Sequence, residues 1–303
     1  MIKRTLYFGN PAYLKTRNEQ MIVQKADTGE EVSVPIEDIG LVILDHQQVT
    51  ITQALLSKLL DNNAAVVSCD NTHHPTGLFL NLSGNTLQSA KFRAQINASA
   101  PLCKQLWQQT IQAKISNQGA LLEQYGISAK NMKFWASEVK SGDSENHEAR
   151  AAAYFWRNLF GSDSSFRRER FGDPPNNMLN YAYAILRACV ARSLVGSGLL
   201  PTLGIHHRNQ YNAYCLADDI MEPYRPFADA LVREVLEDEE QGPLFKLDTD
   251  AKKRLLTLPQ VDVIMENQRS PLMVALQRTT ASLAACFEKK AKKILYPELP
   301  VKL

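Results

Sequence analysis

The sequence lacks the features that mark membrane, disulfide-stabilised and nucleotide-cofactor proteins. No apolar run approaches the roughly 20 residues that span a bilayer, and the N-terminal segment breaks at Gly9 and Pro11 before a signal-peptide core forms. The five cysteines include no CxxC pair, which favours reduced thiols over a zinc site. There is no P-loop, no GxGxxG after a strand and no GxSxG. We therefore expect a cytoplasmic protein without membrane contact, and a metabolic enzyme is disfavoured.

The sequence also lacks an excess of charge of either sign. The 303 residues include 34 Lys and Arg against 32 Asp and Glu, a formal net charge of +2. A nucleic-acid partner would therefore require positive charge gathered on one face, because the average is nearly neutral. The hydrophobic fraction of 45% is typical of a folded chain, and the length suffices for two domains.

The first part of the chain has the texture of a small β-rich domain. Short runs rich in Val, Ile, Leu and Tyr are separated by turn formers. A helix is predicted over Thr52–Leu60 and a buried strand over Ala64–Ser68. Further strands are predicted at Thr5–Phe8, Ala12–Thr16, Gln20–Gln24, Glu31–Pro35 and Gly40–Leu44.

Beyond a hinge near Ser83–Thr86 the texture becomes helical. Apolar residues recur at spacings of three and four through most of the remaining sequence. The stretch Lys289–Lys293 is predicted to close the chain as a basic helix. We therefore predict an α+β protein, with a β-rich domain over residues 1–84 and a larger all-helical domain over residues 85–303.

Acidic residues around Pro223 form the first candidate site. Asp219 and Glu222 are three apart, so on a helix they project from one face, and Pro223 would stop or kink the helix there. Two crowded carboxylates suit a hard divalent cation such as Mg²⁺ or Mn²⁺. The alternative is an ordinary solvated helix face. The Asp218–Asp219 doublet leaves open which aspartate points inward, although the spacing favours Asp219.

Two further segments offer ligands to such a cation. The pair His206–His207 precedes the acidic segment, and an imidazole there could bind the metal or move a proton. Glu148 opens an Ala-rich helix and could complete the cage, since phosphoryl chemistry needs more than two ligands. The alternative for Glu148 is a glutamate that only stabilises the first turn of its helix.

Basic residues that could grip DNA phosphates lie in three places. The candidates are Arg167, Arg168, Arg170, Arg208, Lys289 and Lys290. For the three arginines at 167–170 the alternative is a salt-bridged surface loop, and for the two lysines it is a favourable charge at a helix end.

Five segments carry a resemblance: KISNQ at Lys114–Gln118, EARAAAYF at Glu148–Phe155, NNMLNYAYAIL at Asn176–Leu186, GIHHRNQYN at Gly204–Asn212 and LADDIMEPYRP at Leu216–Pro226. Together they resemble one family, the CRISPR-associated integrase and endonuclease of spacer acquisition, and the resemblance covers most of the chain. The last two segments look like the branch found in type II systems, which have a single large effector nuclease.

The resemblance implies a metal site made of Glu148, His207 and Glu222. Asp219 then supports one of these ligands or replaces one. The implied ion is Mg²⁺ or Mn²⁺, and the three residues are the implied catalytic residues. The reaction is attack by a 3′-hydroxyl of a short DNA fragment on a phosphodiester of the repeat array, with DNA hydrolysis as a side activity.

The resemblance also implies a fold and partners. The N-terminal domain is expected to be β-sandwich-like and to form a homodimer. Two dimers would flank one dimer of a small ferredoxin-like partner in a heterohexamer on double-stranded DNA, and the effector nuclease is a further candidate partner. Two other functions stay open from the residues alone: a stand-alone metal-dependent repair nuclease, and a non-catalytic protein that holds DNA ends.

Overall fold

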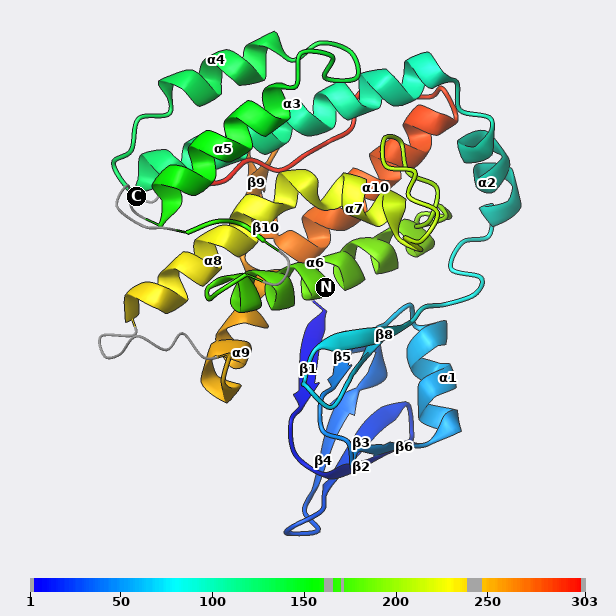
Figure 1. Cartoon of the computed structure of the whole chain (residues 1–303). Coiled ribbons are helices and arrows are strands. Elements are labelled where there is room, and N and C mark those ends of the chain that lie inside the picture. Colours follow the sequence, from blue (N-terminus) through cyan, green and yellow to red (C-terminus); the bar gives the residue numbers. More distant parts are fainter. Residues whose placement is uncertain (1–2, 161–165, 170–171, 239–246, 301–303) are drawn as a thin grey trace.

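The N-terminal region of the computed structural model contains two four-stranded sheets and one helix (Figure 1). The structure describes residues 3–160, 166–169, 172–238 and 247–300. The first sheet has the order β1-β5-β7-β8, in which β1, β5 and β7 are parallel and β8 is antiparallel to β7. The second has the order β4-β3-β2-β6, with helix α1 (Gln53–Asp61) beside it. The strands are β1 (Arg4–Phe8), β2 (Ala12–Arg17), β3 (Gln20–Lys25), β4 (Glu31–Pro35), β5 (Ile39–Leu44), β6 (Thr50–Ile51), β7 (Ala65–Cys69) and β8 (Pro75–Phe79).

The two faces of the first sheet contribute to two different cores. Side chains alternate across a strand, so neighbouring residues point to opposite faces. Val42 and Val66 pack into a core shared with the second sheet and α1. Leu41, Ile43 and Val67 join the core of the helical region. The sheet therefore binds the two parts of the chain together through apolar contact.

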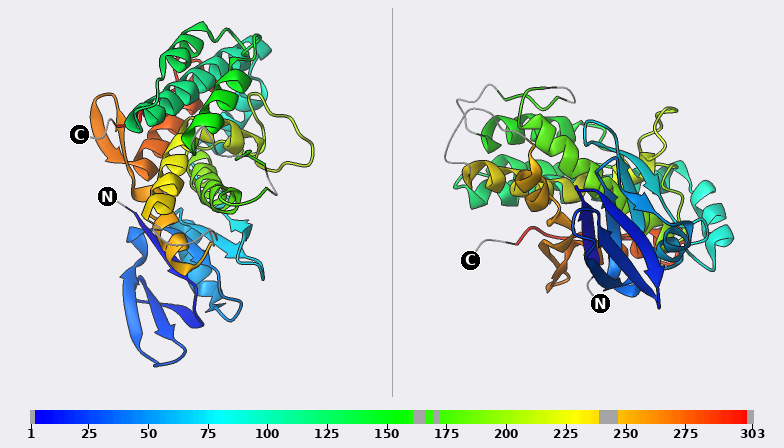
Figure 2. Two further views of the ribbon diagram at one scale, coloured as in Figure 1. Left: turned by 60° about the vertical axis from the view of Figure 1, so that its left-hand side comes forward. Right: turned by 90° about the horizontal axis from the view of Figure 1, so that it is seen from below.

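The rest of the chain is mainly helical and lies at the other end of the molecule (Figures 1 and 2). Helix α3 packs on α4 and α5, and α6 packs on α7, α8 and α10. The helices are α2 (Gln88–Ile96), α3 (Ala100–Gln124), α4 (Lys130–Glu138), α5 (His147–Leu159), α6 (Asn176–Gly196), α7 (Cys215–Met221), α8 (Arg225–Asp238), α9 (Thr249–Leu255) and α10 (Leu272–Phe287), with the 3₁₀ turn η2 (Glu222–Tyr224) between α7 and α8.

The segment between the two parts is fastened to the end of α6. Asn85 Nδ2 donates to the Gly196 carbonyl at 3.0 Å, and Lys91 Nζ donates to the Ser197 carbonyl at 2.9 Å. Arg192 Nε also reaches back to the Asn63 carbonyl at 2.5 Å. Of these bonds, only that of Asn85 falls on the expected hinge, and the division into domains at residue 84 stays a prediction.

The predicted fold class is confirmed, with one addition and one correction. The helical region includes a short hairpin of β9 (Asp262–Met265) and β10 (Gln268–Pro271), which its apolar period did not reveal. The predicted basic helix at the end of the chain is wrong: α10 ends at Phe287, and Lys289 has a positive φ of 60° that a helix cannot continue. Among the described residues, no helix is long and apolar enough to cross a membrane.

Candidate active site

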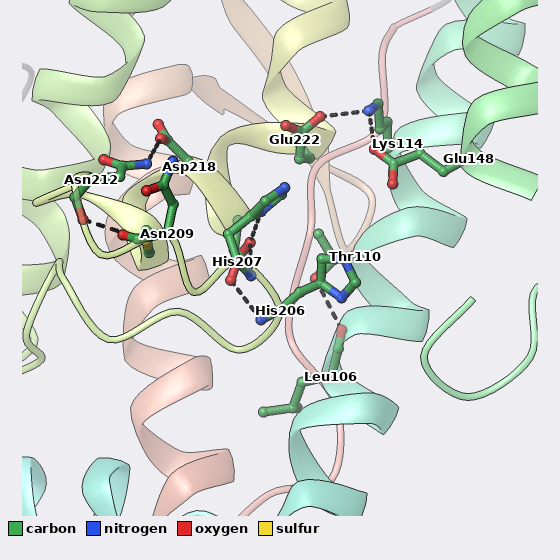
Figure 3. Close-up of polar contacts among 12 residues, drawn as sticks. Leu106, Thr110, Lys114, Glu148, His206, His207, Asn209, Asn212, Asp218 and Glu222 are labelled. Carbon is green, nitrogen blue, oxygen red and sulfur yellow. Dashed lines mark hydrogen bonds and ion pairs between the residues drawn. The ribbon is translucent and has the colours of Figure 1, made fainter. Parts of the chain in front are cut away.

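A buried lysine joins the two glutamates that the sequence singled out (Figure 3). Lys114 lies in the middle of α3, and its Nζ is 2.6 Å from Glu148 Oε1 and 2.6 Å from Glu222 Oε2. The contact with Glu148 is a hydrogen bond, and the contact with Glu222 is an ion pair. Since both oxygens touch one nitrogen, they are separated by no more than twice that distance. Helix α5 and turn η2, far apart in sequence, thus bring two carboxylates to one place.

Glu222 is fixed by the turn that carries it. Pro223 follows it, so α7 ends at Met221 and the chain passes through η2 before α8 begins, as the proline predicts. Asn117, one turn beyond Lys114 on α3, donates through Nδ2 to the Pro223 carbonyl at 2.8 Å. The same helix therefore holds both Lys114 and the backbone of the turn.

Glu148 is fixed by the start of its own helix. Asp143 accepts the backbone N–H groups of His147 and Glu148, at 2.9 and 3.0 Å, through its two carboxylate oxygens. Such a cap satisfies two donors that the first turn leaves unpaired. The Glu148 side chain is 26% exposed, so the cluster opens to solvent on this side.

Arg225 is the second cation at Glu222. Its Nε lies 2.9 Å from Glu222 Oε1, the oxygen that Lys114 does not touch. Burial alone would raise the pKa of Glu222, but Arg225 and Lys114 outweigh it and hold the pKa below its ordinary value. Burial alone would lower the pKa of Lys114, but Glu222 and Glu148 reverse this and raise it. Glu222 and Lys114 are therefore both charged at neutral pH.

His207 is held by Asp219. Its Nδ1 contacts Asp219 Oδ1, and the backbone N–H of His206 donates to Asp219 Oδ2 at 2.8 Å. The hydrogen bond to Asp219 raises the pKa of His207, and the charges of Glu222 and Glu148 act in the same direction. The His207 side chain is 47% exposed. The neighbouring His206 instead stacks on Trp107, with ring centroids 4.1 Å apart.

The two aspartates of the doublet face different partners. Asp219 is fully buried against His207, whereas Asp218 pairs with Arg187 Nε at 2.6 Å and accepts from Asn212 Nδ2 at 2.7 Å. Asp219, and not Asp218, is therefore the aspartate that contacts the histidine.

The carboxylates are not arranged around a metal position as they stand. Across the described ranges, no three His, Cys, Asp or Glu side chains lie close enough to hold an ion. The space between Glu148 and Glu222 is taken by the Lys114 ammonium. The two oxygens nevertheless offer the hard donors that a divalent cation prefers.

The basic candidates differ in what they contact. The guanidinium of Arg168 donates to two asparagines of α6, through Nη1 to Asn176 Oδ1 at 2.9 Å and through Nη2 to Asn180 Oδ1 at 2.8 Å. Lys290 lies 3.1 Å from Glu288. Arg167, Arg208 and Lys289 are exposed, and Arg170 lies outside the described residues.

Sequence reasoning gave no role to Lys114 or Arg225, although both touch the site. Lys114 had a detectable signal. It lies next to Ile115 and three residues after Ile111, on the apolar face of α3. A lysine at a core position is almost always paired, so it pointed to a buried acid.

Comparisons with known proteins identify the family. The family described as CRISPR associated protein Cas1 matches residues 6–255, and the chain belongs to it. CRISPR-associated endonuclease Cas1 of Neisseria meningitidis serogroup C (strain 8013) is 37% identical over 311 residues, covering 100% of this chain and 98% of the relative.

Two solved structures share the fold. A casposase bound to integration product superimposes with a TM-score of 0.79 at 19% identity, covering 97% of this chain and 92% of its own. A chain of a Cas6-RT-Cas1–Cas2 complex gives a TM-score of 0.72 at 20% identity, covering 98% of this chain and 36% of its own. These likenesses concern the fold.

Proposed function

We propose that this member of the Cas1 family is a metal-dependent DNA endonuclease and integrase whose ion is bound by Glu148, His207 and Glu222. The observation that carries the proposal is the cation position between Glu148 and Glu222, now held by the Lys114 ammonium. Two acids from separate elements share one charge there, and the charges of both act on the half-exposed imidazole of His207. Carboxylates on a merely solvated helix face would have no reason to converge in this way.

The donor set fits Mg²⁺ or Mn²⁺. Glu148 and Glu222 supply carboxylate oxygens, and His207 has Nε2 free for a ligand because Nδ1 is held by Asp219. A bound ion supplies polarisation of the scissile phosphate and stabilises charge on the leaving oxygen. Asp219 fixes the tautomer and orientation of the imidazole, a supporting role that matches its full burial.

The proposed reaction is transesterification. The 3′-hydroxyl oxygen of a short DNA fragment forms a bond to the phosphorus at the leader–repeat boundary, and the phosphorus–oxygen bond to the displaced 3′ oxygen breaks. A second attack joins the far end of the repeat on the other strand. His207 takes or returns a proton when it is not bound to the ion. With water as nucleophile, the same residues hydrolyse DNA.

The proposed assembly follows the family. We propose a homodimer formed through residues 1–84, and a heterohexamer in which two dimers flank a dimer of a small ferredoxin-like partner. The structural neighbour named as a Cas1–Cas2 complex supports a partner of this kind. The branch with a single effector nuclease, the contact with that nuclease and a cytoplasmic location remain parts of the proposal.

Double-stranded DNA is the proposed substrate, with exposed basic side chains as phosphate contacts. Arg167, Arg208, Lys289 and Lys290 serve this role, and Arg168 holds the loop that presents Arg167. The net charge of only +2 makes such local contacts necessary.

The test is a Glu222→Gln variant, which removes one carboxylate with little change of shape. With Mg²⁺, we expect strand joining and cleavage to fall by at least about 100-fold, because the loss affects charge stabilisation in the transition state. Glu148→Gln and His207→Ala should act similarly. Circular dichroism and DNA binding should stay close to the parent. A Glu222→Gln protein that joins fragments at the parent rate would refute the site.

The same assay separates the rival functions. A repair nuclease would cleave DNA but give no joined product from a fragment with a free 3′-hydroxyl. A protein that only holds DNA ends would show no dependence on divalent ions in any DNA assay.

A further inference from the structure

Lys114 contacts one carboxylate oxygen of each glutamate. Its ammonium touches Glu148 Oε1 and Glu222 Oε2, both at 2.6 Å, and its side chain is only 10% exposed. A second cation cannot enter between these oxygens while the ammonium is there. Figure 3 shows Lys114 reaching in from α3 between the two carboxylates.

Without a cation, the two carboxylates would repel each other at this distance, more strongly than in water because the site is partly buried. Lys114 therefore keeps the pair assembled. The cost of removing one partner from such a group is large, since it leaves buried charge uncompensated.

Arg225 differs from Lys114 in which oxygen it binds. It pairs with Glu222 Oε1, on the side away from Glu148, at 2.9 Å. Its guanidinium is also held over the Tyr183 ring, 4.6 Å from the centroid. Glu222 would thus keep its orientation if Lys114 moved away. A lysine is suited to moving, because its ammonium is a point charge on a flexible stem.

We propose that Lys114 is a resident cation that holds Glu148 and Glu222 in place before metal loading and competes with the divalent ion for the same two oxygens. This rests on the proposed function, because it takes the two glutamates as metal ligands. Lys114 is then a positioning residue whose ammonium leaves when the ion binds.

The decisive variant is Lys114→Met, which keeps the length and removes the charge. The full chain is titrated with Mn²⁺ alone, and free Mn²⁺ is followed by electron paramagnetic resonance. We expect Mn²⁺ to bind at least about tenfold more tightly than in the parent, equivalent to about 1.4 kcal/mol at 25 °C. The metal-free variant should unfold at a lower temperature, and Mn²⁺ should raise that temperature more than it does in the parent.

Lys252→Met is the matched control. Lys252 is also a buried lysine, 6% exposed and paired with Asp45 at 3.0 Å, and it contacts neither glutamate. We expect this variant to lose stability while keeping the parent affinity for Mn²⁺. If it binds Mn²⁺ more tightly as well, the gain reflects general loosening and the proposal is wrong.

The remaining outcomes separate the two proposals. If Glu222→Gln leaves Mn²⁺ binding unchanged, the metal site itself is misassigned. If Glu222→Gln abolishes binding but Lys114→Met binds no more tightly than the parent, only the competition is overturned. Should Lys114→Met fail to fold, Lys114→Gln keeps a polar side chain without the charge and must show the same tighter binding.

Discussion

Lys114 and Lys252 are both buried lysines on helices, yet they differ in the number of carboxylates that they contact. Lys252 Nζ donates to Asp45 Oδ2 at 3.0 Å, and Asp45 also accepts from the Tyr7 hydroxyl and contacts His73 Nδ1 at 3.1 Å. One carboxylate there is surrounded by three partners and is closed to further ligands. Lys114 instead serves two carboxylates.

A buried ion pair alone therefore does not mark a functional site. The Asp45 group joins the end of β5 to α9 and so ties the N-terminal sheet to the helical region. Three side chains contact the single carboxylate of Asp45, which suits a structural link. The Lys114 group has acids sharing a cation, which suits exchange of that cation for a metal.

The largest expected effect is a loss of stability on removal of the Lys252 charge. Lys252→Met should lower the free energy of unfolding by about 3–5 kcal/mol, because Asp45 would keep a buried charge without its main partner. Urea unfolding followed by circular dichroism measures this. Strand joining well below the unfolding transition should stay near the parent rate. Lys253→Met, which removes an exposed pair with Asp250, should change stability by less than about 1 kcal/mol.

A second prediction concerns Asp229, which lies beside Arg225 and accepts from the Tyr183 hydroxyl at 2.5 Å. Burial raises its pKa to about 7. A carboxyl with a raised pKa contributes stability that is complete below its unfolded value and is lost as pH rises through the folded value.

The parent should therefore lose on the order of 2–3 kcal/mol between pH 5 and pH 8 through this group. Asp229→Asn should flatten that loss in urea unfolding at the two pH values. An unchanged slope in the variant would show that Asp229 is already ionised in the folded protein.

The third prediction, Asp219→Asn, concerns the aspartate that contacts His207 in the proposed active site. The hydrogen bond that His207 donates to Asp219 raises the pKa of His207, so the variant should move that pKa back toward its ordinary value. The stability that His207 contributes is complete below its unfolded pKa and is lost as pH rises through the folded one, and this dependence should shrink. Strand joining should fall by about 10–100-fold. Titration of the His207 ring by NMR is the check, and an unmoved pKa contradicts the assignment.

The smallest effect is expected at the neighbouring aspartate. Asp218→Asn weakens a pair with Arg187, whose side chain is 43% exposed, so stability should change by less than about 1 kcal/mol. Strand joining should stay within about threefold of the parent in the same assay. A loss as large as that of Asp219→Asn would mean that the two aspartates have been interchanged.

Much of the fold could be predicted because its signals are local. The predicted strand at Glu31–Pro35 has the bounds of β4, and those at Ala12–Thr16 and Gln20–Gln24 fall one residue short of β2 and β3. Alternation and turn residues specify such strands without reference to distant parts of the chain. The hairpin of β9 and β10 was not predicted, because strands of four residues are too short to show an alternation of apolar and polar residues.

For the proposed site, the sequence could predict the residues but not their contacts. Glu148, His207 and Glu222 were marked by their segments, and Pro223 by its effect on the helix. The spacing could favour Asp219 over Asp218 without deciding between them, since both lie on a buried helix, and only the contact with His207 distinguishes them.

By itself, the sequence determined most of the strands and helices, the turn at Pro223 and the residue types available for a cation. These depend on interactions among near neighbours in the chain. The tertiary structure alone decided that Lys114 would meet Glu148 and Glu222, and that Lys252 would meet Asp45. Those partners lie far apart in sequence, and helical period gives the face on which a charge lies but not which distant face packs against it.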